Sequence, residues 1–277
     1  MNKHLIRPKY GETVLMEVTP ESAGWDSLHY KVIELKAGES FTEATEGNEA
    51  AVVTLSGNLK LKADDQSFEV SRAGVFIEKS SVLYVPPGKS IEIEAVVDSQ
   101  FSIGAAPAEG KYPTRLFTPD EMPTVIRGEG GAKRQVFFSL AHPLPAERLI
   151  VFEVYVPGGH WSGWPPHCHD GYGDSVYLEE TYYFRTEPET GVAWHRNYRV
   201  DKDFDEIIPA HNGELVLVTE GFHSTAATPG TNLYFLNYLA GDLYDDARST
   251  PPFDDPTHAW ILDDWEKNSM NLPLFDD

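Results

Sequence analysis

The segment 160–185, with the sequence HWSGWPPHCHDGYGDSVYLEETYYFR, constrains the fold of this chain more than any other. His167 and His169 are two residues apart in a stretch that we expect to be extended. Side chains alternate between the two faces of a strand, so both imidazoles point the same way. Loop-forming residues over 170–175 separate them from a strand predicted over 178–185, which is rich in aromatic and β-branched residues. This pattern predicts a β structure with two histidines on one strand face.

A carboxylate and a third histidine follow at positions that suit a metal site. The predicted strand 178–185 contains the adjacent pair Glu179 and Glu180, and the later segment GELVLVTEGFH ends in His223 after a turn at Gly221. A lone histidine is more often a packed or solvated residue than a ligand. Here two histidines from one strand, a glutamate from the next and a histidine from a later hairpin can converge on one ion. Such a mixed set suits zinc, manganese, iron, cobalt or nickel and leaves positions open for water or substrate.

Short strands separated by turns fill both halves of the chain. The 22 glycines and 20 prolines supply the turns, and a helical period of 3.6 residues is almost absent, which is typical of a sandwich or barrel. We therefore predict an all-β fold. The predicted strands are 30–35, 50–55, 59–62, 68–70, 82–85 and 90–97 in the first half, and 135–140, 148–156, 178–185, 192–199, 214–218 and 232–239 in the second.

The two halves are predicted to be diverged copies of one fold. A segment rich in proline and glycine, 107–131, is interpreted as the connection between an N-terminal barrel, 1–106, and a C-terminal barrel, 132–241. An acidic, proline-rich tail, 242–277, is expected to pack on the barrels. The N-terminal half has no histidine after His29. We therefore expect its barrel to bind no metal, and the chain to bind one divalent ion.

The composition excludes several classes of partner. The net charge is −22, with 44 acidic and 22 basic residues, so nucleic acid and anionic membrane surfaces are unfavourable partners. Cys168 is the single cysteine, which excludes an intrachain disulfide. The N-terminal residues lack an apolar signal region, and no apolar run approaches the length of a membrane span. These features favour a cytoplasmic location.

Several stretches resemble the two-cupin isomerase family, which includes 5-deoxyglucuronate isomerase and 5-keto-4-deoxyuronate isomerase. The resemblance extends from about Val18 to Trp265. It implies a bicupin fold, with two antiparallel jelly-roll barrels in one chain and one metal site in the C-terminal barrel. It also implies isomerisation of 5-deoxy-D-glucuronate to 2-deoxy-5-keto-D-gluconate in myo-inositol catabolism. The stretches are VTPESAGWDSLHYKVIELKAGE, RLIVFEVYVPGGHWSGWPPHCHD, LEETYYFR, GFHSTAATPG, YFLNYLAG and DPTHAW.

The resemblance also implies the metal ligands. Carried over residue by residue, they are His167, His169, Glu180 and His223. Alternation along the strand agrees with Glu180, because it places Glu179 on the opposite face unless a bulge intervenes.

Tyrosines and arginines are the candidates for catalysis and substrate binding. Tyr182 shares a strand face with Glu180, so it is the first candidate for a hydroxyl near the metal, although an aromatic ring that fills the barrel is an equal alternative. Tyr234 is a second candidate, on a strand whose orientation is open. The substrate carboxylate favours an arginine, and we prefer Arg134 and Arg196, each of which can instead be a surface residue. His160 is a candidate pocket residue or a loop histidine.

Two other functions remain open. A shell of three histidines and one glutamate also supports metal-dependent dioxygenases and decarboxylases. A non-catalytic, sugar-binding bicupin is the alternative that involves no chemistry. In each case the expected ligand is a small anionic sugar acid, and bicupins often self-associate, so a homo-oligomer is expected.

Overall fold

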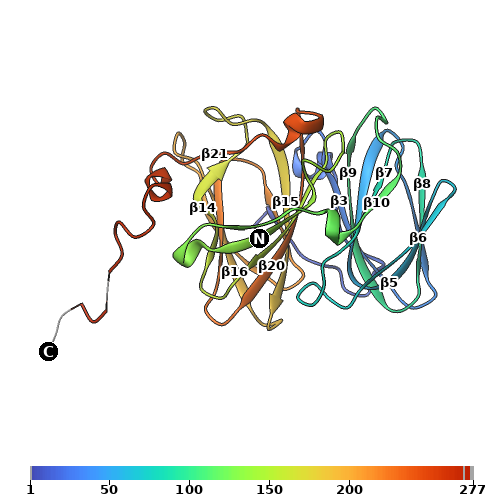
Figure 1. Ribbon diagram of the computed structural model, residues 1–277, viewed down its shortest axis with the longest axis horizontal. Coiled ribbons are helices and arrows are strands. Elements are labelled where there is room, and N and C mark those ends of the chain that lie inside the picture. Colours follow the sequence, from blue (N-terminus) through green and yellow to red (C-terminus); the bar gives the residue numbers. More distant parts are fainter. Residues whose placement is uncertain (1, 271, 275–277) are drawn as a thin grey trace.

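Strands that cover one face of a core alternate between exposed and buried side chains. In β8 (Ser90–Ala95), the serine and glutamates are exposed and the isoleucines and alanine are buried, as expected of a strand with one solvated face. By contrast, β20 (Asn232–Gly241) is buried at every position after the first, because both its faces are covered. The computed structural model describes residues 2–270 and 272–274, and its strands form two β-barrels side by side (Figure 1). The predicted all-β class is confirmed.

The C-terminal barrel consists of two antiparallel sheets that face each other. The seven-stranded sheet has the order β1 (Leu5–Ile6), β18 (Leu215–Val218), β15 (Leu178–Glu187), β20, β13 (Ile150–Val156), β12 (Arg134–Leu140) and β11 (Thr124–Arg127). The five-stranded sheet has the order β17 (Asp205–His211), β16 (Val192–Tyr198), β19 (Phe222–Ala227), β14 (Trp161–Cys168) and β21 (Phe253–Asp254).

The N-terminal barrel is one branched sheet of nine strands. Its main path has the order β10 (Arg115–Phe117), β7 (Val82–Val85), β5 (Asn48–Ala63), β9 (Ser99–Pro107), β3 (His29–Leu35) and β2 (Val14–Val18). The branch contains β4 (Ser40–Ala44), β6 (Gln66–Arg72) and β8. Because β5 is 16 residues long, its first half pairs with β7 and β9 and its second half with β6 and β8.

Among the described residues, helical structure is confined to single turns. These are α1 (Pro20–Ala23), η1 (Pro119–Glu121), η2 (Gly130–Ala132), η3 (Asp245–Ser249) and η4 (Ala259–Leu262). Over the residues that the structure describes, no helix is long and apolar enough to pass through a membrane.

The chain termini and the connection contribute strands in a way that the sequence does not predict. β1 lies in the predicted N-terminal barrel, 1–106, yet it pairs with β18 of the C-terminal barrel. Within the predicted connection, 107–131, β10 pairs with the N-terminal barrel and β11 with the C-terminal barrel. β21 lies in the predicted tail, 242–277, and pairs with β14. Strands of two to four residues are too short to show the alternation of polar and apolar side chains by which strands are predicted. Their positions are set instead by the strands of the barrels with which they pair.

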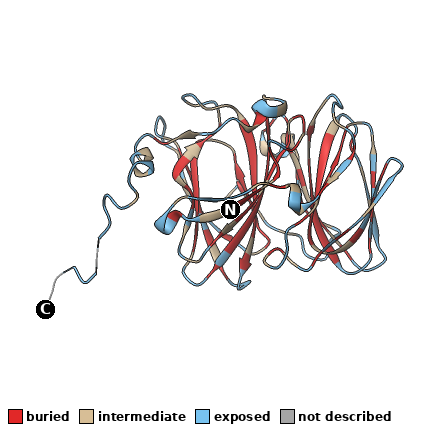
Figure 2. Ribbon diagram, in the orientation of Figure 1, coloured by how far each residue is buried: buried red, intermediate tan, exposed pale blue. Residues whose placement is uncertain are grey.

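An apolar layer lies between the two barrels. Tyr238 on β20 packs against β9, where a Cβ atom on Gly104 would lie 2.0 Å from Tyr238 Cδ1, so the close approach requires glycine. The Tyr238 hydroxyl is 3.1 Å from Ser102 Oγ, and its ring centroid is 5.3 Å from that of Tyr30. One cluster of buried apolar residues therefore includes side chains of both halves, and Figure 2 shows buried residues along the facing sheets.

A buried ion pair also joins the barrels. Arg72 on β6 and Glu153 on β13 lie 2.7 Å apart from Nη2 to Oε2, and their side chains are at most 1% exposed. The Tyr234 hydroxyl donates to the same carboxylate at 2.8 Å. Other donors of Arg72 reach the carbonyl oxygens of Thr54 and Glu78 and the Tyr155 hydroxyl. This pair is fully hydrogen-bonded, which is the condition under which a buried charge is tolerated.

Two buried glutamates bind backbone amides of the opposite half of the chain. Glu179 accepts hydrogen bonds from the amides of residues 26–28 at 2.6, 3.0 and 2.7 Å. Reciprocally, Glu49 of the N-terminal barrel accepts from the amides of residues 147–149 at 2.9, 2.6 and 2.6 Å. Hydrogen bonds to a charged acceptor are stronger than neutral ones, so these carboxylates fix the two barrels relative to each other.

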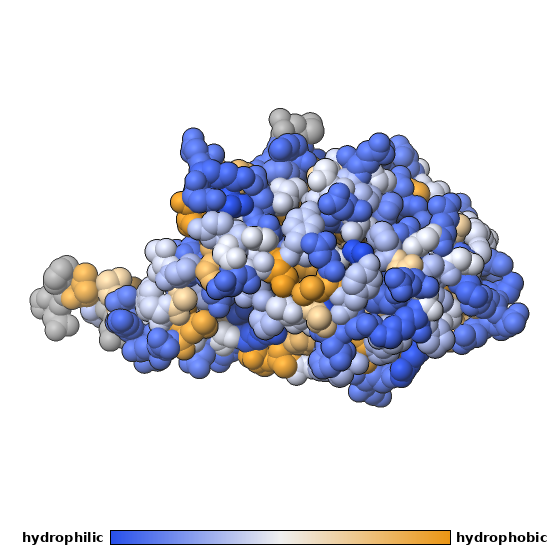
Figure 3. All heavy atoms as spheres, turned by 90° about the horizontal axis from the view of Figure 1, so that it is seen from above, coloured by the Kyte–Doolittle hydropathy of each residue, from blue (hydrophilic) through white to orange (hydrophobic). Residues whose placement is uncertain are grey.

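The face of the molecule that is seen from above is mostly hydrophilic (Figure 3). The face seen from above has small, separate apolar patches among polar and charged side chains (Figure 3). This distribution agrees with the strongly negative net charge of −22.

Candidate metal centre

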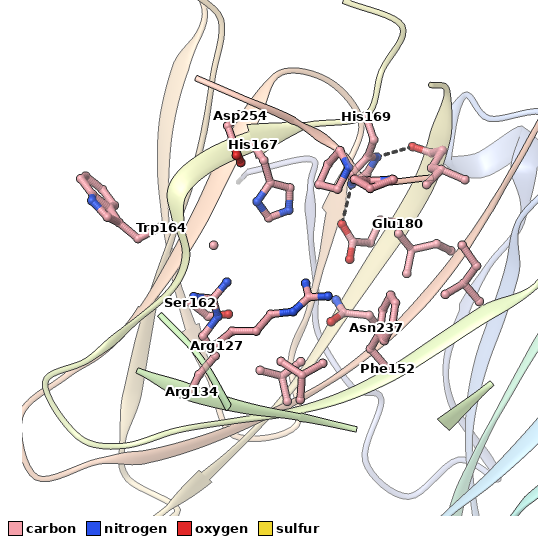
Figure 4. Close-up of a pocket in the computed structure, with 18 of the residues that line it drawn as sticks. Arg127, Arg134, Phe152, Ser162, Trp164, His167, His169, Glu180, Asn237 and Asp254 are labelled. Carbon is pink, nitrogen blue, oxygen red and sulfur yellow. Dashed lines mark hydrogen bonds and ion pairs between the residues drawn. The ribbon is translucent and has the colours of Figure 1, made fainter. Parts of the chain in front are cut away.

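A pocket of about 470 Å³ opens into the C-terminal barrel, and both of its sheets contribute to the walls. His167 and His169 lie on one side and Glu180 projects toward them from the other sheet (Figure 4). The pocket thus gathers residues that are far apart in sequence, as predicted for a convergent site.

Strand pairing explains how the histidines meet. His167 on β14 is the register partner of His223 on β19, so the two side chains lie on the same face of the five-stranded sheet. His169 follows the end of β14 by one residue and keeps that face. Gly163 makes room for this arrangement, because its φ is +65° and an added Cβ would lie 3.3 Å from His167 Cε1.

His169, Glu180 and His223 form a compact group of ligand atoms. One ligand atom from each lies within 4.8 Å of the others, and all three residues are buried. His169 Nε2 is 2.8 Å from Glu180 Oε2, and His223 Nε2 is 3.3 Å from the same oxygen. His169 Nδ1 lies 2.8 Å from the carbonyl oxygen of Leu178. Donation from Nδ1 to that carbonyl leaves Nε2 as the metal-binding nitrogen.

His167 lies beside this group. Its ring centroid is 4.5 Å from that of His223 and 6.3 Å from that of His169. The group of ligand atoms within 4.8 Å does not include it among the described residues. His167 therefore stays a prediction as the fourth ligand.

The electrostatics favour an ionised Glu180 and neutral His167 and His223, the states that a metal requires, but not a neutral His169. Burial by itself raises the pKa of Glu180, but the neighbouring His169 and His223 outweigh it and lower the pKa to about 2. Burial lowers the pKa of His223 and holds the pKa of His167 well below its usual range. For His169, the contact with Glu180 outweighs burial and raises the pKa. At neutral pH the site therefore contains a carboxylate and two imidazoles that favour the neutral form.

The buried nitrogens of His223 fit a metal at this position. The contact with Glu180 is too poorly aligned for a hydrogen bond, so neither ring nitrogen of this imidazole has a hydrogen-bond partner among the described residues. Leaving buried polar atoms unpaired costs free energy. An ion bound by His223 Nε2 satisfies one of them.

Glu179 and Glu180 point in opposite directions, as alternation predicts. Glu180 faces the pocket, whereas Glu179 faces the N-terminal barrel and binds the amides of residues 26–28. No bulge is recorded where β15 pairs with β18 and β20. Cys168 likewise points away from the histidines and packs with Tyr198 and Phe222.

Tyr182 is the tyrosine that lines the pocket. Its ring centroid is 5.8 Å from that of His223, and burial raises the pKa of its hydroxyl well above the usual range. Sequence reasoning missed His195, which stacks on His223 at 6.0 Å and is held between Thr225 Oγ1 at 2.7 Å and Asn197 Oδ1 at 3.0 Å. His195 therefore packs against the ring of His223 and restricts its orientation.

Three predicted residues lie elsewhere. Tyr234 faces the other barrel and binds Glu153, because alternation along β20 turns its neighbours Phe235 and Asn237 into the pocket instead. Arg196 is on the outer face of β16 and pairs with Asp205 through two hydrogen bonds at 2.8 and 2.7 Å. His160 lies in the turn before β14, with Nδ1 3.2 Å from the carbonyl oxygen of Gly158. None of the three lines this pocket, and the roles predicted for Tyr234, Arg196 and His160 stay predictions.

Arg134 does line the pocket, together with residues that sequence reasoning missed. Arg127 comes from the predicted connection, Asp254 from the predicted tail, and Asn237 from β20. Alternation places Asn237 on the face opposite to Tyr234 and Tyr238, but it does not tell which of the two faces meets the pocket. Arg127 lies on β11 and Asp254 on β21. These strands are too short for their sequences to predict them.

Comparisons with known proteins support one family. The model of the KduI/IolB family matches residues 4–261. A protein of Geobacillus kaustophilus (strain HTA426) described as 5-deoxy-glucuronate isomerase is 37% identical over 268 residues, which cover 94% of this chain and 95% of that one. A protein of the same description from Geobacillus thermodenitrificans (strain NG80-2) is 36% identical over 255 residues, which cover 90% and 91% of the two chains.

Solved structures agree with the sequence comparisons. The crystal structure of an IolB-like protein from Salmonella typhimurium LT2 superimposes with a TM-score of 0.88 at 33% identity, over 93% of this chain and 98% of that one. An oxalate decarboxylase from Lactobacillus farciminis, a bicupin, superimposes with a TM-score of 0.63 at 12% identity over 88% of each chain. At that identity the likeness shows the fold alone, and it confirms the predicted bicupin. The chain therefore belongs to the KduI/IolB family.

Proposed function

We propose that this protein is a metal-dependent aldose–ketose isomerase that converts 5-deoxy-D-glucuronate to 2-deoxy-5-keto-D-gluconate. The observation that carries the proposal is the match along 94% of the chain to a relative described as 5-deoxy-glucuronate isomerase. The buried group of His169, Glu180 and His223 supports it independently.

The proposed ligands are His169, Glu180 and His223, with His167 as the fourth. They hold one divalent ion per chain, chosen from zinc, manganese, iron, cobalt and nickel. When bound, such an ion supplies Lewis acidity toward the carbonyl and the adjacent hydroxyl of the substrate. In the isomerisation a proton leaves C2, a proton is delivered to C1, and the hydroxyl proton passes from O2 to O1. No electrons are gained or lost overall, so no organic cofactor is required.

Tyr182 is the proposed hydrogen-bond donor to the reacting oxygens. Burial raises the pKa of its hydroxyl, so the phenol keeps its proton at neutral pH and can donate it in a hydrogen bond. The ring lies beside His223, and the hydroxyl has no recorded hydrogen bond to any described residue. The donor is therefore free to reach the substrate.

Replacing Tyr182 with phenylalanine should lower kcat roughly 100- to 1000-fold and leave the metal content unchanged, as expected for the loss of one positioned donor. Steady-state kinetics and elemental analysis measure both effects. Tyr183→Phe is the matched control, because the Tyr183 hydroxyl binds Gln100 between the barrels at 3.1 Å. Equal activity of Tyr182→Phe and the wild type would remove Tyr182 from the proposed chemistry.

Incubation of metal-loaded protein with 5-deoxy-D-glucuronate without oxygen tests the proposed function. We expect the keto isomer to form, with about one ion per chain. Oxygen uptake by the iron-loaded protein would favour a dioxygenase, release of carbon dioxide a decarboxylase, and binding without turnover a sugar-binding bicupin. Self-association and a cytoplasmic location stay predictions from the sequence.

A further inference from the structure

Two arginines face each other on one wall of the pocket. Arg127 on β11 and Arg134 on β12 are register partners, so their side chains project from directly opposite positions. Both line the pocket that contains His167, His169 and Glu180. They lie on the side of the pocket opposite the two histidines (Figure 4). The wall formed by these two residues is called the arginine pair below.

The arginine pair has no acidic partner. Among the described residues, neither guanidinium forms an ion pair within 4.0 Å, although the chain has twice as many acidic as basic residues. Arg134 donates from Nη1 to the carbonyl oxygen of Ala132 at 3.2 Å, and Arg127 lies 5.3 Å from the ring centroid of Phe138. Arg196, by contrast, pairs with Asp205 in the same barrel. The pair therefore keeps most of its donors unused.

Placing two like charges directly opposite each other costs stability. Burial, followed by the charge of Arg127, lowers the pKa of Arg134 to about 10. Arg127 itself is exposed at its position in β11, although it also lines the pocket. Both groups still carry their charge at neutral pH. A bound anion relieves the repulsion and satisfies the donors at the same time.

Asp254 is the protein's own alternative partner. It lies on β21 opposite His167, lines the same pocket and contributes to the charge environment of Arg134. It forms no ion pair with either member of the arginine pair among the described residues. Burial raises the pKa of Asp254, although the charge of Arg134 partly offsets it. The arginine pair is thus left for an external anion.

We propose that the arginine pair binds the carboxylate of the substrate and selects sugar acids over neutral sugars. A planar carboxylate matches the paired donors of a guanidinium. Because the pair lies opposite the histidines, binding there turns the other end of a short sugar acid toward the proposed metal ligands. This specificity rests on the proposed function for its substrate, but the anion site itself does not depend on catalysis.

The test is calorimetric titration of the full-length, metal-loaded protein with D-gluconate and with D-glucitol. These unreactive probes differ in whether a carboxylate or a hydroxymethyl group ends the chain. We expect gluconate to bind roughly 10- to 100-fold more tightly than glucitol, the ratio expected for charge-assisted hydrogen bonds. Arg127→Gln and Arg134→Gln should each lose most of the preference for gluconate over glucitol and keep the metal. Arg196→Gln removes an arginine outside the pocket, so it should keep the preference.

Equal binding of gluconate and glucitol by the wild type would overturn the inference. So would an unchanged ratio in both Arg127→Gln and Arg134→Gln, which would place the carboxylate on the metal instead. The inference would also fail if adding Asp254→Asn to either arginine variant restored the preference for gluconate. That result would mean that the arginine pair serves to neutralise Asp254. If the protein preferred gluconate but had no isomerase activity, only the proposed function would be contradicted. If both arginine variants kept isomerase activity with an unchanged KM, only the role of the arginine pair would be contradicted.

Discussion

Replacing Glu180 with glutamine should remove most of the bound metal and lower kcat/KM by roughly three orders of magnitude or more. Glu180 is the carboxylate that His169 and His223 share, at 2.8 and 3.3 Å. An amide has no charge and coordinates a divalent ion poorly, so the Lewis acidity worth several kcal/mol is lost with the ion. Elemental analysis of the purified variant and steady-state kinetics measure the two effects.

Glu179→Gln is the matched control, because it makes the same chemical change at the adjacent position. We expect it to keep the metal and to lower the free energy of unfolding by about 3 kcal/mol, since a charged acceptor of three backbone amides becomes neutral. Loss of metal from Glu179→Gln and retention by Glu180→Gln would mean that β15 presents the opposite face to the pocket.

Replacing Arg72 with methionine should lower the free energy of unfolding by about 3–5 kcal/mol, because it leaves Glu153 charged and unpaired between the barrels. Both side chains are at most 1% exposed. Urea denaturation of the metal-loaded protein measures the loss.

Two further variants separate burial from charge. Arg72→Met combined with Glu153→Leu should recover part of the loss, because no unpaired charge remains. Lys62→Met breaks an exposed pair with Glu92, in which the side chains are 53% and 60% exposed, and should change stability by less than about 1 kcal/mol. A loss that small for Arg72→Met would show that water reaches Glu153 between the barrels.

The convergence of the candidate ligands was predictable because strand alternation and spacing fix which side chains meet. His169, Glu180 and His223 converge as expected, and the choice of Glu180 over Glu179 follows from a strand without a bulge. The face of β20 was not predictable. Its residues are buried on both sides, so hydrophobicity does not distinguish Tyr234, which faces the other barrel, from Asn237, which faces the pocket.

The arginine pair lay beyond prediction for a different reason. Arg134 begins a recognisable strand, but Arg127 belongs to β11, a strand of four residues that are all exposed. Its position depends on pairing with β12, which the sequence does not encode locally. The same holds for Asp254, which reaches the pocket because β21 pairs with β14. Long strands are thus predictable from their own residues, whereas short edge strands are fixed by their partners.

Family membership and the buried ligand group converge on one chemical claim, the isomerisation of a sugar acid. The most direct test follows the spectrum of 5-deoxy-D-glucuronate by nuclear magnetic resonance, without oxygen, after addition of protein loaded in turn with zinc, manganese, iron, cobalt or nickel. Loss of the aldehyde signal and appearance of 2-deoxy-5-keto-D-gluconate with at least one metal is the predicted result. An unchanged spectrum with every metal, from protein that carries about one ion per chain, would contradict it.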